Sequence, residues 1–262
     1  MQKTKIEWVK NPDGSQGYSW NPIKGKCPAG CKLPDGRIYC YGHTLYDGRL
    51  KRYDPGEPKF DDKAWRRGYL KLSRARKSLG VFLCSTFDLF HPITTSKHHK
   101  RVRLSWRDEL FADIEMLPRH HFYILTKFPQ NIDRPMPPNV WLGVSVTKSS
   151  DLWRLRYLED AKASLKFISI EPMLELPESC GFHFSRHPDS IREDISLIGE
   201  LESGAFDWII VGRLTRFGHK HDPDLIDIKQ IVGSAREYNV PIFLKNNLSG
   251  IWPGELIQEG PG

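Results

Sequence analysis

The chain has 262 residues, 39% hydrophobic and 27% charged, a composition typical of a globular protein rather than a disordered or collagen-like one. No apolar run reaches the ~18 to 20 residues that a membrane span requires, and the first twenty residues lack the apolar core of a secretory signal. These features predict a cytoplasmic protein with no membrane partner. The formal charge of +7 favours phosphate-bearing partners, although the total does not say where the cations lie.

Six apolar runs rich in β-branched and aromatic residues predict strands that are buried on both faces, as in a parallel sheet. They are 81–87, 122–126, 140–146, 165–170, 208–211 and 240–244. Helical periodicity lies between them, at 61–79, 96–117, 149–163 and 222–239. This β/α order predicts one α/β domain over 1–262, closed into a barrel or open as a doubly wound sheet, with its chemistry at the carboxyl ends of the strands. The polar stretch 178–206 is expected to be an insertion before the sixth strand.

Three of the five cysteines, Cys27, Cys31 and Cys40, lie in one segment rich in glycine and proline, the cysteine loop (residues 20–43). In a reducing compartment, clustered thiols favour a metal over a disulfide scaffold. Three thiolates can hold an iron–sulfur cubane with one open iron, and with His43 they also make the ligand inventory of a structural zinc site. Unliganded buried thiols are a third interpretation, so the segment alone leaves the choice open. The isolated Cys84 and Cys180 are expected to be core residues.

Short motifs follow one another along most of the chain. They are Thr4–Trp8, Trp20–Pro22, Cys40–Tyr41, Ser85–His91, Leu125–Lys127 with Pro129, Asn139–Val146, Ser169–Pro172, Ile209–Gly212 and Phe243–Lys245. Taken together and in this order, they resemble a phage- and prophage-associated family of radical-SAM-like proteins of largely unassigned function, distantly similar to spore photoproduct lyase. The resemblance implies a partial parallel (β/α) barrel of about six strands, with a [4Fe–4S] cluster on the three cysteines of the loop and S-adenosylmethionine bound to its open iron.

Two features depart from the family pattern. The family usually has a longer first gap and a short final C-x-x-C, whereas here Cys27 and Cys31 are close and Cys40 lies well beyond them. After Gly212 the family usually continues with a second glycine and a glutamate, but this chain has two cations, Arg213 and Arg216.

Strand-end residues have the chemistry that S-adenosylmethionine and a substrate need, namely acceptors, a cation and an aromatic platform. The resemblance places Tyr39 or Tyr41 near the adenine. We expect the remaining cofactor contacts from Ser85, Thr86 and Asp88 to the ammonium, Lys127 to the carboxylate, and Ser145 to the ribose or carboxylate. Glu171 is expected to act at the ribose or the substrate as a catalytic residue, and the substrate contacts are expected from Arg213, Arg216 and Lys245. A capping or loop hydrogen bond is the alternative for each polar residue.

Basic stretches interleaved with aromatics occur at 65–77, 97–107 and 213–221 and suit phosphate contact with base stacking. For the first two, the alternative is the solvated face of an amphipathic helix. The resemblance therefore implies a radical enzyme that uses a 5′-deoxyadenosyl radical to abstract hydrogen from its substrate. The basic stretches favour a nucleobase or nucleotide-bearing substrate, and the resemblance suggests modified phage DNA. Its partners would be nucleic acid or a nucleotide and an external one-electron reductant of the flavodoxin or ferredoxin type. The alternatives are a zinc-stabilised nucleic-acid-binding protein without catalysis and a radical enzyme acting on a small metabolite or peptide.

Overall fold

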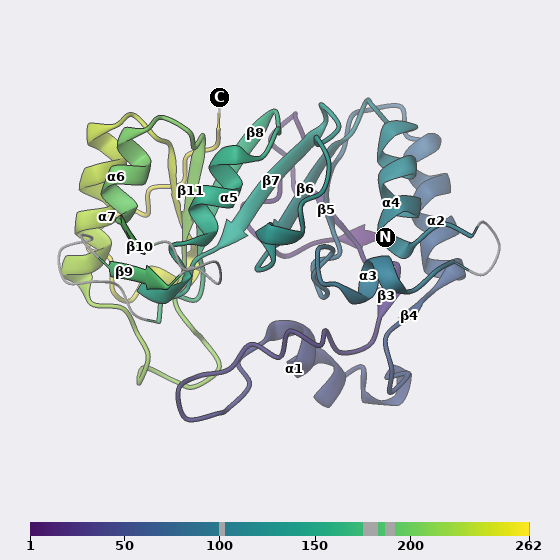
Figure 1. Cartoon of the computed structure of the whole chain (residues 1–262), viewed down its shortest axis with the longest axis horizontal. Helices are drawn as coiled ribbons and strands as arrows, with labels where there is room; N and C mark the ends of the chain where they lie inside the picture. The colour runs from purple at the N-terminus through teal and green to yellow at the C-terminus, as the bar shows by residue number, and fades with distance from the viewer. Residues whose placement is uncertain (100–102, 175–182, 187–191, 262) are drawn as a thin grey trace. The chain divides into compact units, whose positions relative to one another are not determined.

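The computed structural model describes residues 1–99, 103–174, 183–186 and 192–261 (Figure 1). The chain is a mixed α/β protein, and the eight main strands within the described residues are mostly parallel. Contacts within the chain divide it into two compact units, residues 1–141 and 142–262. In the part of the chain that is described, no helix has the length and apolar character needed to cross a membrane.

The first unit contains four of the main strands. In spatial order they are β1 (Gln2–Lys3), β2 (Tyr18–Trp20), β5 (Gly80–Leu83) and β6 (His121–Thr126). β1 is antiparallel to β2, whereas β2, β5 and β6 are parallel. The short strands β3 (Ile23–Lys24) and β4 (Lys59–Phe60) form a separate antiparallel pair. The remaining small elements are α1 (Tyr41–Asp47), α3 (Ile93–Ser96), η1 (Lys51–Tyr53) and η2 (Pro129–Asn131).

The longer helices α2 (Asp62–Ser73) and α4 (Trp106–Glu115) lie side by side in this unit (Figure 1). Both begin at a capping side chain, because Asp61 accepts hydrogen bonds from backbone N–H groups of α2 and Ser105 accepts one in α4. α2 approaches β2 closely: a Cβ at Gly68 would lie 2.1 Å from Nε1 of the buried Trp20. Glycine at position 68 therefore allows the helix to pack against the strand.

The second unit contains β8 (Leu165–Ile170), β11 (Trp208–Val211) and β12 (Ile242–Leu244), which are parallel neighbours in that order. β7 (Val140–Ser145) precedes β8 in the strand order and begins two residues before the unit boundary. The helices are α5 (Arg154–Asp160), α6 (Leu197–Glu202) and α7 (Leu225–Glu237), and α6 packs against α7 (Figure 1). The strands β9 (His183–Arg186) and β10 (Arg192–Ile195) pair antiparallel, and η3 (Ser149–Asp151) and η5 (Asn246–Leu248) are single 3₁₀ turns.

The mostly parallel α/β class and all six predicted strands are confirmed, whereas closure into a barrel stays a prediction. The run 81–87 is shorter than expected, because the strand ends at Leu83 and Cys84 adopts a left-handed backbone with φ of 55°. The expected helix 96–117 begins only at Trp106, after a bridge between His98 and Ser105. The predicted insertion 178–206 contains β9, β10 and α6, while Cys180 lies outside the described residues.

Candidate functional site

The cysteine loop folds so that two distant cysteines become neighbours. Cys31 and Cys40 are nine positions apart, but the chain between them forms a tight hairpin. The backbone N–H of Leu33 donates to the carbonyl of Arg37 at 2.8 Å, and that of Tyr39 donates to the carbonyl of Cys31 at 3.0 Å. This pairing brings the chain back beside Cys31. The long spacing between Cys31 and Cys40 is therefore compatible with the two cysteines lying close together.

The thiols of Cys31 and Cys40 share a hydrogen bond that raises the pKa of Cys31 and lowers that of Cys40. Cys40 also immediately precedes α1, and the backbone N–H groups of His43 and Gly42 in the first turn lower its pKa further, although its side chain makes no capping hydrogen bond. Backbone donors of this kind favour the thiolate, the form that binds metals. Cys40 is therefore the most acidic thiol of the loop.

The third thiol, Cys27, is buried, and burial raises its pKa to about 11. Its sulfur accepts hydrogen bonds from the backbone N–H groups of Ala29 and Asp88, and it interacts electrostatically with both Cys31 and Cys40. The three predicted cysteines thus form one group in the first unit. The loop that follows β5, which contains Asp88, contributes a donor to this group.

Helix α1 packs tightly against the loop after β5. A Cβ at Gly42 would lie only 2.6 Å from the carbonyl oxygen of Thr86, so this contact requires glycine. The imidazole Nε2 of His43 lies 2.7 Å from the carbonyl oxygen of Cys27, which ties the start of α1 to the beginning of the cysteine loop. Ser85 in turn exchanges hydrogen bonds with the side chain of Asn21 at 3.1 and 3.3 Å. The predicted residues Ser85 and Thr86 therefore lie beside the cysteines.

Asp88 organises the ends of two strands. Its Oδ1 accepts from the hydroxyl of Thr126 at 2.7 Å and from the backbone N–H of Phe90 at 3.0 Å, and its Oδ2 accepts from the backbone N–H of Lys127 at 2.8 Å. Burial raises the pKa of Asp88. Lys127 follows β6, and its positive charge acts on the thiol of Cys31 and on Asp88. Both predicted residues are thus at the thiol group, with Asp88 already engaged in holding the two loops together.

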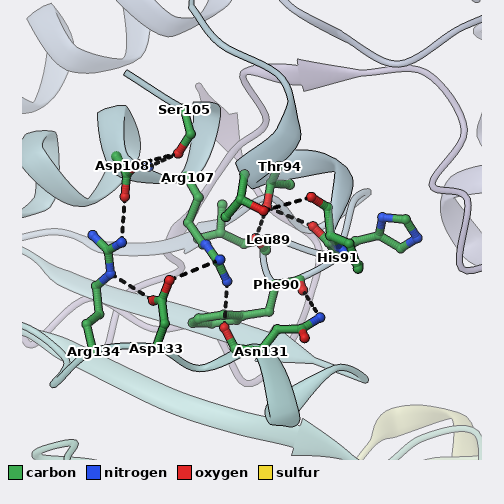
Figure 2. A network of polar contacts seen from close by, with 12 residues as sticks. Leu89, Phe90, His91, Thr94, Ser105, Arg107, Asp108, Asn131, Asp133 and Arg134 are labelled. Atoms are coloured by element: carbon green, nitrogen blue, oxygen red, sulfur yellow. Dashed lines mark hydrogen bonds and ion pairs between the residues drawn. The ribbon is translucent and has the colours of Figure 1, made fainter. Parts of the chain in front are cut away.

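A polar network supports these loops from α4 (Figure 2). Arg107 Nη1 donates to the carbonyl of Asn131 at 2.6 Å, and the amide of Asn131 donates to the carbonyl of Phe90 at 2.9 Å. Arg107 is only 5% exposed and also pairs with Asp133 at 3.2 Å. The sequence placed this arginine in a basic stretch suited to phosphate or solvent, and for Arg107 that interpretation is wrong because its guanidinium is used inside the protein.

In the second unit, three strand ends meet in register. Ile170, Val211 and Leu244 are aligned across β8, β11 and β12, so the residues that follow them are Glu171, Gly212 and Lys245. The ammonium of Lys245 forms an ion pair and hydrogen bond with Glu171. A Cβ at Gly212 would lie 2.9 Å from Cδ of Lys245 and 3.2 Å from Cγ of Glu171, so glycine makes room for the pair.

The other predicted residues of this unit have mixed roles. Arg213 is largely engaged within its loop, because its Nε donates to the carbonyl of Asn247 at 2.7 Å and its Nη1 pairs with Asp222 at 2.6 Å. Arg216 is exposed, with its guanidinium 5.4 Å from the ring centre of Phe217. Ser145 is buried at the end of β7, where its carbonyl accepts a hydrogen bond from Arg154 at 2.7 Å. Within the first unit, Tyr39 is half-buried and Tyr41 is 59% exposed.

The four described cysteines, Cys27, Cys31, Cys40 and Cys84, are free thiols. Among the described residues, no group of three or more His, Cys, Asp or Glu side chains is arranged to hold a metal ion. The chemistry of the donor set nevertheless suits an iron–sulfur cluster, because a cubane binds each thiolate through a different iron and the pKa of Cys40 is already lowered. The hydrogen bond to Cys40 and burial raise the pKa of Cys31, and the charge of Lys127 opposes them. A zinc site made by the three cysteines and His43 is the alternative. If Nε2 of His43 were the zinc ligand, it would have to give up its contact with the carbonyl oxygen of Cys27.

The described residues define an α/β protein with a group of thiols at the carboxyl ends of parallel strands. The family model for proteins of unknown function termed DUF5131 matches residues 3–253, and the chain belongs to this family. Neither the curated proteins nor the solved structures include a significant match to it.

Proposed function

We propose that this protein is a radical S-adenosylmethionine enzyme on a partial parallel (β/α) barrel, which abstracts hydrogen from a nucleobase or nucleotide-bearing substrate. The observation that supports this most is the grouping of Cys27, Cys31 and Cys40, achieved by the hairpin between the last two. Three thiol ligands on one loop leave one iron of a [4Fe–4S] cluster open to a small molecule. When bound, the cluster and S-adenosylmethionine would supply one-electron cleavage of the sulfonium and the hydrogen-abstracting radical.

The chain's own residues would hold and orient these groups. Helix α1 and the loop after β5 would position Cys40 and Cys27. The pKa of Cys40 is lowered, whereas burial raises the pKa of Cys27. The ammonium of Lys127, which acts on Cys31, is the cation best placed in the first unit to bind a carboxylate beside the thiols. The exposed ring of Tyr41, directly after Cys40, offers an aromatic face for an adenine. Asp88 would act as a positioning residue, because its carboxylate is engaged with Thr126 and backbone N–H groups.

In the second unit, Glu171 and Lys245 form an ion pair at the strand ends. The carboxylate of Glu171 can accept a hydroxyl hydrogen bond from a ribose or a substrate. The position of the pair directly after β8 and β12 is where parallel α/β sheets carry their ligands. We assign substrate binding to this pair together with the exposed Arg216.

The test is anaerobic reconstitution with iron and sulfide, followed by iron, sulfide and zinc analysis. We expect about one four-iron cluster per chain. Cys27→Ala, Cys31→Ala and Cys40→Ala should each lose it, whereas Cys84→Ala and His43→Ala should retain it, since neither residue is assigned as a ligand. One zinc per chain that is lost in His43→Ala would overturn the proposal in favour of a zinc-stabilised protein without catalysis.

A second measurement separates cluster binding from the proposed chemistry. The reconstituted, reduced protein should cleave S-adenosylmethionine to 5′-deoxyadenosine and methionine even without substrate. Lys127→Ala should weaken S-adenosylmethionine binding while iron content stays at the wild-type level. Unchanged affinity in Lys127→Ala and Ser145→Ala would reject the assignment of the strand-end residues.

A further inference from the structure

One short stretch of the chain, the basic segment (residues 63–77), carries positive charge without any negative charge. It contains no Asp or Glu, and its seven cations are Lys63, Arg66, Arg67, Lys71, Arg74, Arg76 and Lys77. This number equals the formal net charge of +7, so the rest of the chain carries as many acidic as basic residues. The solvated face of an ordinary helix usually mixes both signs. A segment that holds the whole excess is therefore unusual as a mere solubilising surface.

The basic segment is α2 from its second residue together with the turn that follows it. All seven cationic side chains are exposed, whereas Ala64, Gly68 and Leu72 are buried on the opposite face. The spacings of three or four residues from Lys63 to Arg74 place cations along one side of the helix. At 1.5 Å per residue, this row is about 16 Å long.

Few anions of the protein itself neutralise this row. In the described chain, Lys77 pairs with Asp13 at 3.5 Å, and both side chains are largely exposed, so the pair is weak. Arg67 donates to the carbonyl of Lys63 at 3.2 Å, and the ammonium of Lys71 lies 4.2 Å from the ring centre of Tyr18. Neither contact supplies a negative charge. The row is thus an exposed array of cations with few anionic partners in the described part of the chain, and the nearest acidic residues in the sequence are Asp61 and Asp62 at the start of α2.

We propose that the basic segment is a docking surface for the phosphate backbone of a nucleic acid. A duplex carries one negative charge per about 1.7 Å of its axis, so a row of about 16 Å faces several phosphates at once. Arginine forks suit phosphate oxygens, and release of condensed counterions adds to the affinity. A membrane surface fits less well, because a helix that lies in lipid must expose apolar side chains and the apolar face of α2 is buried. The inference is independent of the proposed function, since it requires no cluster.

The test is the affinity of the full-length chain for a labelled DNA duplex of about 20 base pairs. Fluorescence anisotropy measures this affinity at several salt concentrations. Arg66→Ala with Arg74→Ala should weaken binding on the order of tenfold near 0.1 M salt and reduce the salt slope by about 2. The matched control, Lys162→Ala with Lys229→Ala, removes two exposed cations elsewhere and should stay within about twofold of the wild type. Arg66→Lys with Arg74→Lys keeps the charge and should retain the wild-type salt slope.

Wild-type protein that shows no salt-sensitive binding to the duplex would overturn the proposal. An equal loss of DNA affinity in the Arg66→Ala, Arg74→Ala variant and in the control variant would also overturn it, because the total charge of the protein would then explain the binding. Binding to anionic lipid vesicles without binding to DNA would replace it with a membrane surface. Wild-type protein that binds DNA but fails to assemble iron would reject the proposed function alone, because the docking surface requires no cluster.

Discussion

Replacing Gly42 with alanine tests whether the cysteine group depends on close packing of α1. The new Cβ would lie 2.6 Å from the backbone carbonyl oxygen of Thr86, so the helix or the loop after β5 must shift by several tenths of an ångström. Overpacking of this kind costs about 1–3 kcal/mol. The higher helix propensity of alanine offsets up to about 1 kcal/mol of that cost. Taking about 2 kcal/mol for the packing cost, we expect Gly42→Ala to lower the free energy of unfolding by about 1–2 kcal/mol.

Urea unfolding followed by tryptophan fluorescence measures this change. The matched control is Gly233→Ala in α7, where a Cβ would meet no atom within 4 Å. That variant should gain about 0.5–1 kcal/mol from helix propensity alone. Because Cys40 immediately precedes α1 and would move with it, Gly42→Ala should hold less iron after reconstitution than Gly233→Ala. A Gly42→Ala protein as stable as the wild type would refute the packing argument.

Two further predictions concern titratable groups of the first unit. Burial raises the pKa of Asp113 to about 7, so between about pH 4 and 7 the folded protein keeps a proton that the unfolded chain has released. The free energy of unfolding should therefore fall by on the order of 3 kcal/mol as pH rises across this range. In urea titrations at several pH values, Asp113→Asn should show a smaller fall than the wild type. An equal dependence of the unfolding free energy on pH in the two proteins would contradict this. In metal-free protein at pH 7, iodoacetamide should modify Cys40, whose pKa is lowered, before Cys27, whose pKa is raised to about 11. Peptide mass mapping decides the order, and earlier modification of Cys27 would contradict it.

The strands were predictable because burial on both faces leaves a continuous apolar run. Every residue of β5, β11 and β12 is buried, and these runs are visible without the structure. β2 was missed because its three residues, Tyr18 to Trp20, are too few to show a pattern. The end of β5 was also misjudged, since nothing in the composition of Cys84–Phe87 reveals the left-handed backbone at Cys84 that turns the chain out of the sheet.

The residues of the candidate site were predictable as strand-end positions, but their pairing was not. The spacing of Cys31 and Cys40 departs from the family pattern, and only the backbone pairing of the intervening hairpin shows that the two thiols meet. Arg107 has the same sequence context as a surface cation, yet its guanidinium lies among carbonyl and carboxylate oxygens in the interior. Side-chain identity predicts which interactions are possible, while long-range packing selects the one that forms.

Charged residues that are already engaged within the protein are poor probes of ligand binding. Asp88 and Arg213 both follow parallel strands, but each already has several hydrogen-bond partners within its own unit. Removing either would leave neighbouring buried donors or acceptors without a partner, which disrupts the loop whether or not a ligand is present. Loss of activity in Asp88→Ala or Arg213→Ala would therefore say little about ligand contact. Lys127, whose charge acts on the thiol of Cys31, is a better probe, because its substitution should change affinity more than stability.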